Sequence, residues 1–248
     1  MWKSRAHRPI SHAPTRPRSQ TALTNRDQHH HGTCAVDPGS AHAITASLDT
    51  TGAPTPSADY WESATDRVTL ETVTAALVGL RAAADLARTT GRAREAASWS
   101  TAAARIATAT ATRWAPRGYP RFLPDGGADA AVGLLAALAP DLPGLPGAVT
   151  TAGQTLKLPN GGIRPGRDWP HHDGLAWTPE TAMLAWGSHL TDPTSSNRWL
   201  RWLDTHRTPA GSLPEKVTPA GHPASVAPLG WTAALVLLST TSLTPPVS

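Results

Sequence analysis

Apolar residues recur at helical spacing along most of the chain after its first forty or so residues. Within 67–89, Val73, Leu77, Leu80 and Ala84 stand three or four positions apart and line one helix face, with alanine between them. The same spacing predicts helices over 67–89, 92–112, 127–139, 178–190, 195–207 and 226–240. Four tryptophans fall inside these helices and are predicted to be core or inter-helix residues: Trp99, Trp186, Trp199 and Trp202.

Two short segments mark helix boundaries. Thr178-Pro179-Glu180 puts a capping residue, a proline and an acid at a helix start, where free amides and the helix dipole favour them. Glu180 is therefore interpreted as an acid that stabilises this helix start. Asp192-Pro193 is expected to end the same helix.

Long segments rich in Gly, Pro and Trp separate the predicted helices. They cover 55–66, 113–126, 140–176 and 208–225. No alternating strand pattern of useful length is present, so we expect at most two short strands, and no repeat of fixed period is found. An all-α chain that keeps its unusual residues in long loops favours a helical toroid or solenoid with its site at one rim.

Charge divides the chain into an arm and a body. The formal net charge is +4, yet the first 36 residues alone hold six basic residues and one acid, and the rest is nearly neutral. A neutral body does not predict a nucleic-acid groove. Residues 1–41 lack periodicity, so we expect a disordered arm in which His29-His30-His31 is an unstructured run. The predicted domain covers 42–241, followed by a tail over 242–248.

The remaining composition excludes several classes of protein. A single cysteine, Cys34, cannot form an internal disulfide or a four-cysteine zinc site. No stretch approaches 18 consecutive apolar residues, so no membrane partner is expected. The basic start is not followed by the apolar region of a secretory signal, so the expected location is cytoplasmic.

Two glutamates lie in loops and are candidates for chemistry. Glu62 follows Asp59-Tyr60-Trp61 in a Pro-rich segment, and Glu215 follows Leu213-Pro214. A protonated carboxyl on one side of a cleft and an ionised one on the other are the minimum apparatus for glycoside hydrolysis. Taken alone, two loop glutamates are also compatible with an ordinary solvated surface.

The segments around these glutamates resemble glycoside hydrolase family 15, which contains glucoamylases, glucodextranases and some trehalases. The resemblance covers roughly 43–240, and its ordered blocks are Asp59-Tyr60-Trp61-Glu62, Gly161-Gly162-Ile163-Arg164, Asp173-Gly174-Leu175-Ala176-Trp177-Thr178-Pro179, Leu213-Pro214-Glu215, Gly221-His222-Pro223 and Ala227-Pro228-Leu229-Gly230-Trp231-Thr232-Ala233-Ala234.

The resemblance implies a fold, a reaction and a set of site residues. The fold is an (α/α)6 toroid, and the reaction is hydrolysis of terminal α-linked glucose with inversion, without a metal or another cofactor. By matching position, Glu62 is the expected general acid and Glu215 the base that activates water. Arg164 matches the arginine that contacts the sugar. Trp61, Trp177 and Trp231 match tryptophans of the pocket wall.

Several positions depart from the family pattern. Ser63 replaces a second acid, Pro165 replaces an aromatic residue, and Lys216 replaces a frequent glutamine. The Arg-Asp hairpin that holds the outer hydroxyls of the sugar has no counterpart before Glu62. We therefore expect about half of the twelve-helix toroid, a truncated and impaired enzyme, and possible association with a missing N-terminal half. The alternative is a non-catalytic remnant that binds carbohydrate or associates with a partner.

Overall fold

The structure is a computed structural model, and it describes residues 38–241. The histidine run, the C-terminal tail and all but the last four residues of the predicted basic arm lie outside the described residues. Helix α1 (Gly39–Ser47) begins three residues before the predicted start of the domain. Within 38–241, no helix is both long and apolar enough to cross a membrane.

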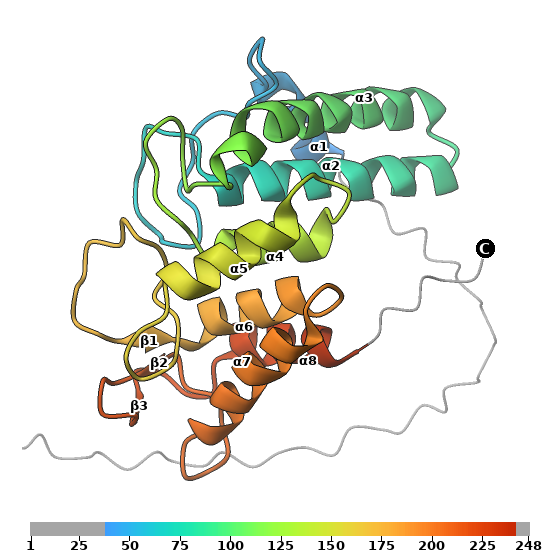
Figure 1. Ribbon diagram of the computed structural model, residues 1–248. Helices are drawn as coiled ribbons and strands as arrows, with labels where there is room; N and C mark the ends of the chain where they lie inside the picture. Colours follow the sequence, from blue (N-terminus) through green and yellow to red (C-terminus); the bar gives the residue numbers. More distant parts are fainter. Residues whose placement is uncertain (1–37, 242–248) are drawn as a thin grey trace, which may run out of the picture. The chain divides into compact units, whose positions relative to one another are not determined.

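The described part of the chain is mostly helical, with seven further α-helices after α1 (Figure 1). These are α2 (Leu70–Thr89), α3 (Ala93–Ala109), α4 (Ala131–Leu138), α5 (Leu145–Thr155), α6 (Thr178–Ser188), α7 (Pro193–Thr205) and α8 (Gly230–Thr240). The even-numbered helices pack in chain order, α2 on α4, α4 on α6 and α6 on α8. Each of α3, α5 and α7 packs on the helix that precedes it, so the helices form a two-layer series of hairpins.

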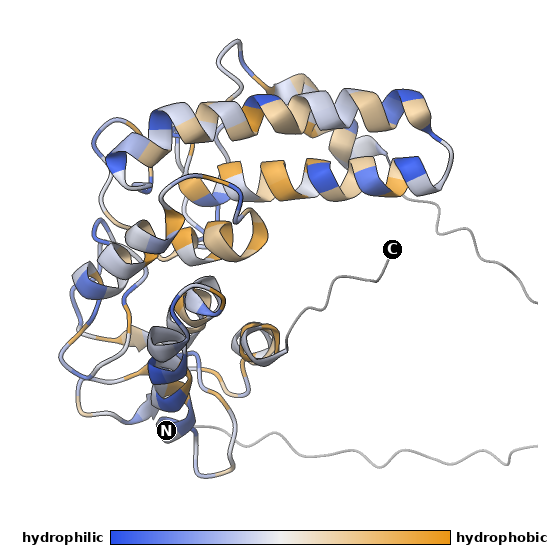
Figure 2. Ribbon diagram, turned by 45° about the vertical axis from the view of Figure 1, so that its right-hand side comes forward, coloured by the Kyte–Doolittle hydropathy of each residue, from blue (hydrophilic) through white to orange (hydrophobic). Residues whose placement is uncertain are grey.

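Helix α2 illustrates how the sequence forms this layer. Its predicted apolar residues are buried, among them Val73, Leu77 and Leu80, which are at most 1% exposed. The Thr69 side chain accepts a hydrogen bond from the Thr72 N–H and caps the helix start. Figure 2 shows that the first half of α2 and nearly all of α4 are apolar, whereas α7 carries strongly hydrophilic residues.

Helices α4 and α6 approach closely because glycine occupies the crossing point. A Cβ atom on Gly133 of α4 would lie 2.3 Å from the backbone oxygen of Met183 in α6. A Cβ on Gly187 would lie 2.6 Å from the Cα of Gly133. The close approach fixes α6, whose first turn faces the site described below.

Two expectations about element boundaries were wrong. Helix α5 lies inside the predicted loop 140–176, because Gly144, Pro146 and Gly147 at its start resemble turn residues. Asp192 does not end α6, which stops at Ser188. The Asp192 carboxylate instead accepts a hydrogen bond from the Ser195 N–H and caps the start of α7. Pro193 is the first residue of α7.

A small antiparallel sheet of three two-residue strands also exceeds the two strands that were expected (Figure 1). Strand β2 (Lys216–Val217) pairs with both β1 (Ala176–Trp177) and β3 (Pro223–Ala224). Segments this short cannot display a period of two, so the sequence pattern did not reveal them. The pairing places Trp177 directly opposite Lys216, which brings two loops of the predicted site together.

Candidate active site

The loop that carries Glu62 turns sharply before α2. The Trp61 N–H donates to the Asp59 carboxylate at 3.0 Å, and the Glu62 N–H donates to the Asp59 backbone oxygen at 2.8 Å. Glu62 has a φ of 54°, in the left-handed region that non-glycine residues rarely adopt. Its side chain is exposed, and no hydrogen bond or ion pair to another described residue restrains its carboxylate. Residues held in such conformations cost about 1–3 kcal/mol and cluster at functional sites.

A buried ion cluster lies beneath this loop. The Arg121 guanidinium, 6% exposed, donates from Nη2 to Asp59 Oδ1 at 3.0 Å and from Nη1 to Asp129 Oδ2 at 2.9 Å. The Tyr60 hydroxyl donates to Asp129 at 2.6 Å. Burial raises the pKa of Asp129, and the Arg121 charge and the Tyr60 hydrogen bond oppose that rise. The sequence pattern does not reveal this cluster, because an arginine and two aspartates in separate loops carry no motif.

Aromatic rings from four separate segments meet above the ion cluster. Trp169 makes edge-to-face contacts with Trp61 and with Trp177, with ring centroids 4.9 Å and 5.3 Å apart. Tyr60 contacts Trp231 in the same way at 6.1 Å. The structure therefore brings together the three predicted wall tryptophans through two rings, Tyr60 and Trp169, that were not predicted as site residues.

Glu215 is held from both sides of its carboxylate. The Lys216 ammonium lies 3.7 Å from Oε1 and 4.1 Å from the centroid of the Trp177 ring. The Ser225 hydroxyl donates a hydrogen bond to Oε2. Ser225 has a φ of 66°, so this partner also occupies the left-handed region. These contacts orient the carboxylate next to the Trp177 end of the ring cluster.

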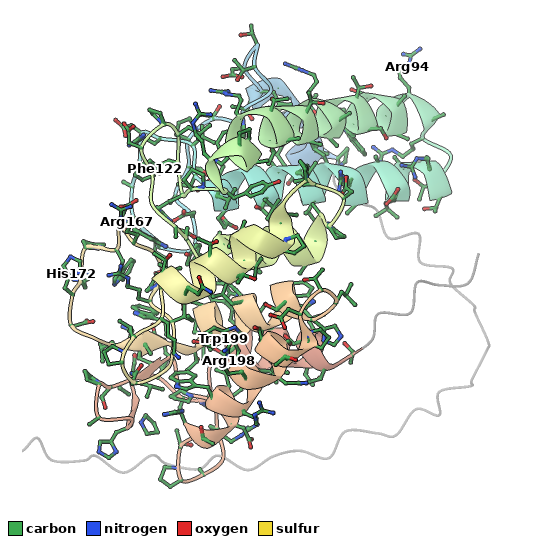
Figure 3. The ribbon with its side chains drawn as sticks, viewed as in Figure 1. Arg94, Phe122, Arg167, His172, Arg198 and Trp199 are labelled. Atoms are coloured by element: carbon green, nitrogen blue, oxygen red, sulfur yellow. The ribbon has the colours of Figure 1, made fainter. Side chains whose placement is uncertain are left out.

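Arg164 lies on the neighbouring loop. It lines a cavity of about 130 Å³ together with His171, His172 and Asp173. The His171 ring contacts Trp169 at 5.3 Å, so this cavity borders the ring cluster. Figure 3 shows Phe122, Arg167 and His172 on the loops at the left of the view, away from the α7 residues Arg198 and Trp199.

Glu180 differs from its predicted capping role. It lies in the first turn of α6 as expected, but it is only 2% exposed, and its Oε2 has no hydrogen-bond partner among the described residues. Desolvation raises its pKa to about 8, with further contributions from the charges of Asp129 and Glu215. Position in the helix was predictable from the sequence, but burial was not.

The four helix tryptophans behave as predicted. Trp99 and Trp199 are buried in the core, and Trp186 and Trp202 are partly buried against it. The Trp202 indole N–H donates to the Asn160 backbone oxygen at 2.9 Å. The rings on loops and at helix starts are therefore the ones available to a site.

Comparisons with known proteins agree with this architecture at the level of the fold. No protein family profile matches the chain, and neither does any curated protein. Among solved structures, a wild-type glycosidase shares 22% identity with a TM-score of 0.61, over 79% of this chain and 56% of that chain. A glycosidase variant in complex with glucose shares 23% identity with a TM-score of 0.60, over 75% and 54%.

These likenesses define a glycoside hydrolase-like fold. The chain spans little more than half the length of the solved structures that it matches.

Proposed function

We propose that the protein is a glycoside hydrolase of the glucoamylase-like type, family 15, that acts on terminal α-linked glucose with inversion. The helical layers support a partial (α/α)6 toroid, with α2, α4, α6 and α8 as inner helices and α3, α5 and α7 as outer ones. The site lies in the loops at the ends of these helices, where toroid enzymes of this kind would bind a sugar end.

One observation carries the proposal. Trp61 and Trp177 both pack against Trp169, although 116 positions separate them in the sequence. Trp61 directly precedes Glu62, and Trp177 lies under Lys216, the neighbour of Glu215. The two candidate carboxylates therefore belong to segments that converge on one set of rings. Indole faces of this kind suit the apolar face of a pyranose ring.

The proposed reaction is a single displacement. Glu62 donates its proton to the leaving glycosidic oxygen while the bond to the anomeric carbon breaks. Glu215 takes a proton from a water molecule that attacks that carbon from the opposite face. Lys216 and Ser225 contact the two oxygens of the Glu215 carboxylate and so orient it for the role of a general base. Arg164 binds a sugar hydroxyl, and Trp61, Trp177 and Trp231 form the wall.

The experiment is an assay of glucose release from maltose, soluble starch, dextran and trehalose. Glu62→Gln and Glu215→Gln should each abolish release, because an amide neither donates a carboxyl proton nor accepts one from water. Glu95→Gln is the matched control, since Glu95 pairs with Arg92 on α3, away from the rings. Release that survives both site substitutions would refute the proposal.

A second candidate function is carbohydrate binding without hydrolysis. The exposed ring of Trp231, at 39% exposure, supports it, because an accessible indole binds a sugar face without any acid. In that case the wild type would bind glucosides in calorimetry but release no glucose, and Trp231→Ala would weaken binding. Loss of binding on Trp231→Ala together with release by the wild type would instead support the hydrolase.

A further inference from the structure

Arg121 connects three parts of the molecule that the proposed site requires. Its side chain reaches Asp59 in the loop before Glu62 and Asp129 at the start of α4. Its guanidinium carbon also lies 3.4 Å from the centroid of the Trp61 ring. One buried side chain thus contacts the anchor of the Glu62 loop and one wall of the ring cluster.

The backbone around Arg121 is itself held in place. The Leu70 N–H at the start of α2 donates to the Arg121 backbone oxygen at 2.6 Å, and the Arg121 N–H donates to the Gly127 oxygen at 2.8 Å. Asp129 is equally fixed, because its Oδ1 accepts from the Ala131 N–H at 2.8 Å. The guanidinium therefore projects from a rigid base formed by α2 and α4 toward a loop that has no helix or strand of its own.

Asp59 transmits this rigidity to the site. Its carboxylate accepts the Trp61 N–H, and its backbone oxygen accepts the Glu62 N–H. An Asp59 side chain at 0% exposure cannot exchange Arg121 for water. Because Arg121 holds the Asp59 carboxylate, it also positions Trp61 and the backbone of Glu62 through these two hydrogen bonds.

We propose that Arg121 is a positioning residue that holds the Asp59–Glu62 loop in its strained turn by bridging Asp59 to Asp129 and stacking on Trp61. A role of Arg121 in catalysis rests on the proposed hydrolase function. Its effect on the conformation of the Asp59–Glu62 loop does not. Only arginine meets all three demands, because its planar fork reaches two carboxylates while its flat face covers an indole. A lysine ammonium has three donors on a single point charge, so it offers neither the spread of the guanidinium fork nor a flat face for the indole.

The test compares Arg121→Lys with Arg81→Lys in the full chain. Arg81 forms a two-bond ion pair with Asp141 on the exposed side of α2, so its substitution controls for loss of a bidentate pair. Backbone hydrogen exchange is followed at Trp61 and Glu62 and, for the helix core, at Leu77 and Leu80. Arg121→Lys should speed exchange at Trp61 and Glu62 by about tenfold or more and leave the α2 amides within about twofold of wild type. Arg81→Lys should leave the loop amides unchanged.

A merely structural role predicts a different pattern. Arg121→Lys would then speed exchange in α2 and in the loop together, and that result, or an unchanged loop, would overturn the proposal. If Arg121→Lys does not fold, Asp59→Asn replaces it, since the amide keeps an acceptor for the Trp61 N–H but weakens the bond to Arg121. Its expected result is the same loop-specific acceleration, and an unchanged loop would again overturn the proposal.

Kinetics separates this inference from the proposed function. With an active wild type, Arg121→Lys should lower kcat by about tenfold or more with less change in KM, because a misplaced acid slows chemistry more than binding. An equal change in both, or a change in KM alone, would overturn the catalytic part. If the wild type is inactive but Arg121→Lys still speeds hydrogen exchange at Trp61 and Glu62, the proposed hydrolase function is refuted. The proposal that Arg121 positions the loop is then supported.

Discussion

Trp61 and Trp169 meet edge to face, with ring centroids 4.9 Å apart and ring planes at 89°. Trp61 belongs to the loop before α2, and Trp169 belongs to the long segment between α5 and α6. Neither indole N–H has a hydrogen-bond partner among residues 38–241. The Trp177 indole N–H is also buried without a partner among these residues, so all three rings in contact around Trp169 leave their donors unsatisfied.

Substitution of Trp169 tests whether these rings act as one surface. Trp169→Leu should lower glucoside affinity or glucose release by about tenfold, because both Trp61 and Trp177 lose the ring that separates and supports them. Trp186→Leu is the control, since Trp186 is a partly buried tryptophan of α6 outside the cluster. Calorimetric titration with maltose would measure the effect. Equal losses for the two variants would mean that the rings matter only for packing.

Glu180 should make the stability of the fold depend on pH. The native pKa is about 8 and the ordinary value 4.5, so between these values the native state keeps a proton that the unfolded chain releases. As the pH rises from about 4.5 to about 8, the free energy of unfolding should therefore fall by about 1.4 kcal/mol per pH unit. Above pH 8 this loss should level off, and below pH 4.5 Glu180 should make no contribution. Urea unfolding at several pH values would show the slope.

Glu180→Gln provides the internal comparison for that slope. The amide carries no titrating proton, so the difference in stability between variant and wild type should grow in favour of the variant as pH rises from about 5 to about 8. Parallel stability curves for the two proteins would contradict the buried, protonated state of Glu180.

The glycine crossing of α4 and α6 should tolerate no side chain. Gly133→Ala places a methyl group against the Met183 backbone, which cannot rotate away, so we expect a loss of about 2 kcal/mol or more in the free energy of unfolding. Gly147 in α5 is a matched control with open space around it, and Gly147→Ala should stabilise by roughly 0.5–1 kcal/mol. Urea unfolding of both variants tests the pair, and a neutral Gly133→Ala would mean that the helices separate freely.

Ser225 combines strain with a bond to Glu215, and two substitutions separate these roles. Ser225→Gly relieves the left-handed φ and should be more stable than Ser225→Ala by about 1 kcal/mol. Both variants remove the hydroxyl donor to Glu215, so both should lower kcat in the proposed reaction by a similar factor of about ten. If kcat instead falls more in the less stable variant, Ser225→Ala, than in Ser225→Gly, the role of Ser225 is purely structural.

The sequence by itself determined most of the helices, though not α5, and the loops that carry the candidate site. The apolar period along α2 and the polar cap at Thr69 are local properties, so they are visible without any tertiary contact. Resemblance in several short blocks indicated a glycoside hydrolase, and the fold agrees with that class. The roles of Glu62, Glu215, Arg164 and the wall tryptophans stay predictions.

Only the tertiary structure decided which of these residues meet. Arg121 and Asp59 stand 62 positions apart, and they form a buried ion pair because the fold brings their two loops together. Burial, not sequence position, turns Glu180 from a helix-start acid into a group with a pKa of about 8. Pairing energies and desolvation depend on distance and solvent in three dimensions, and neither quantity is encoded in the local pattern of residues.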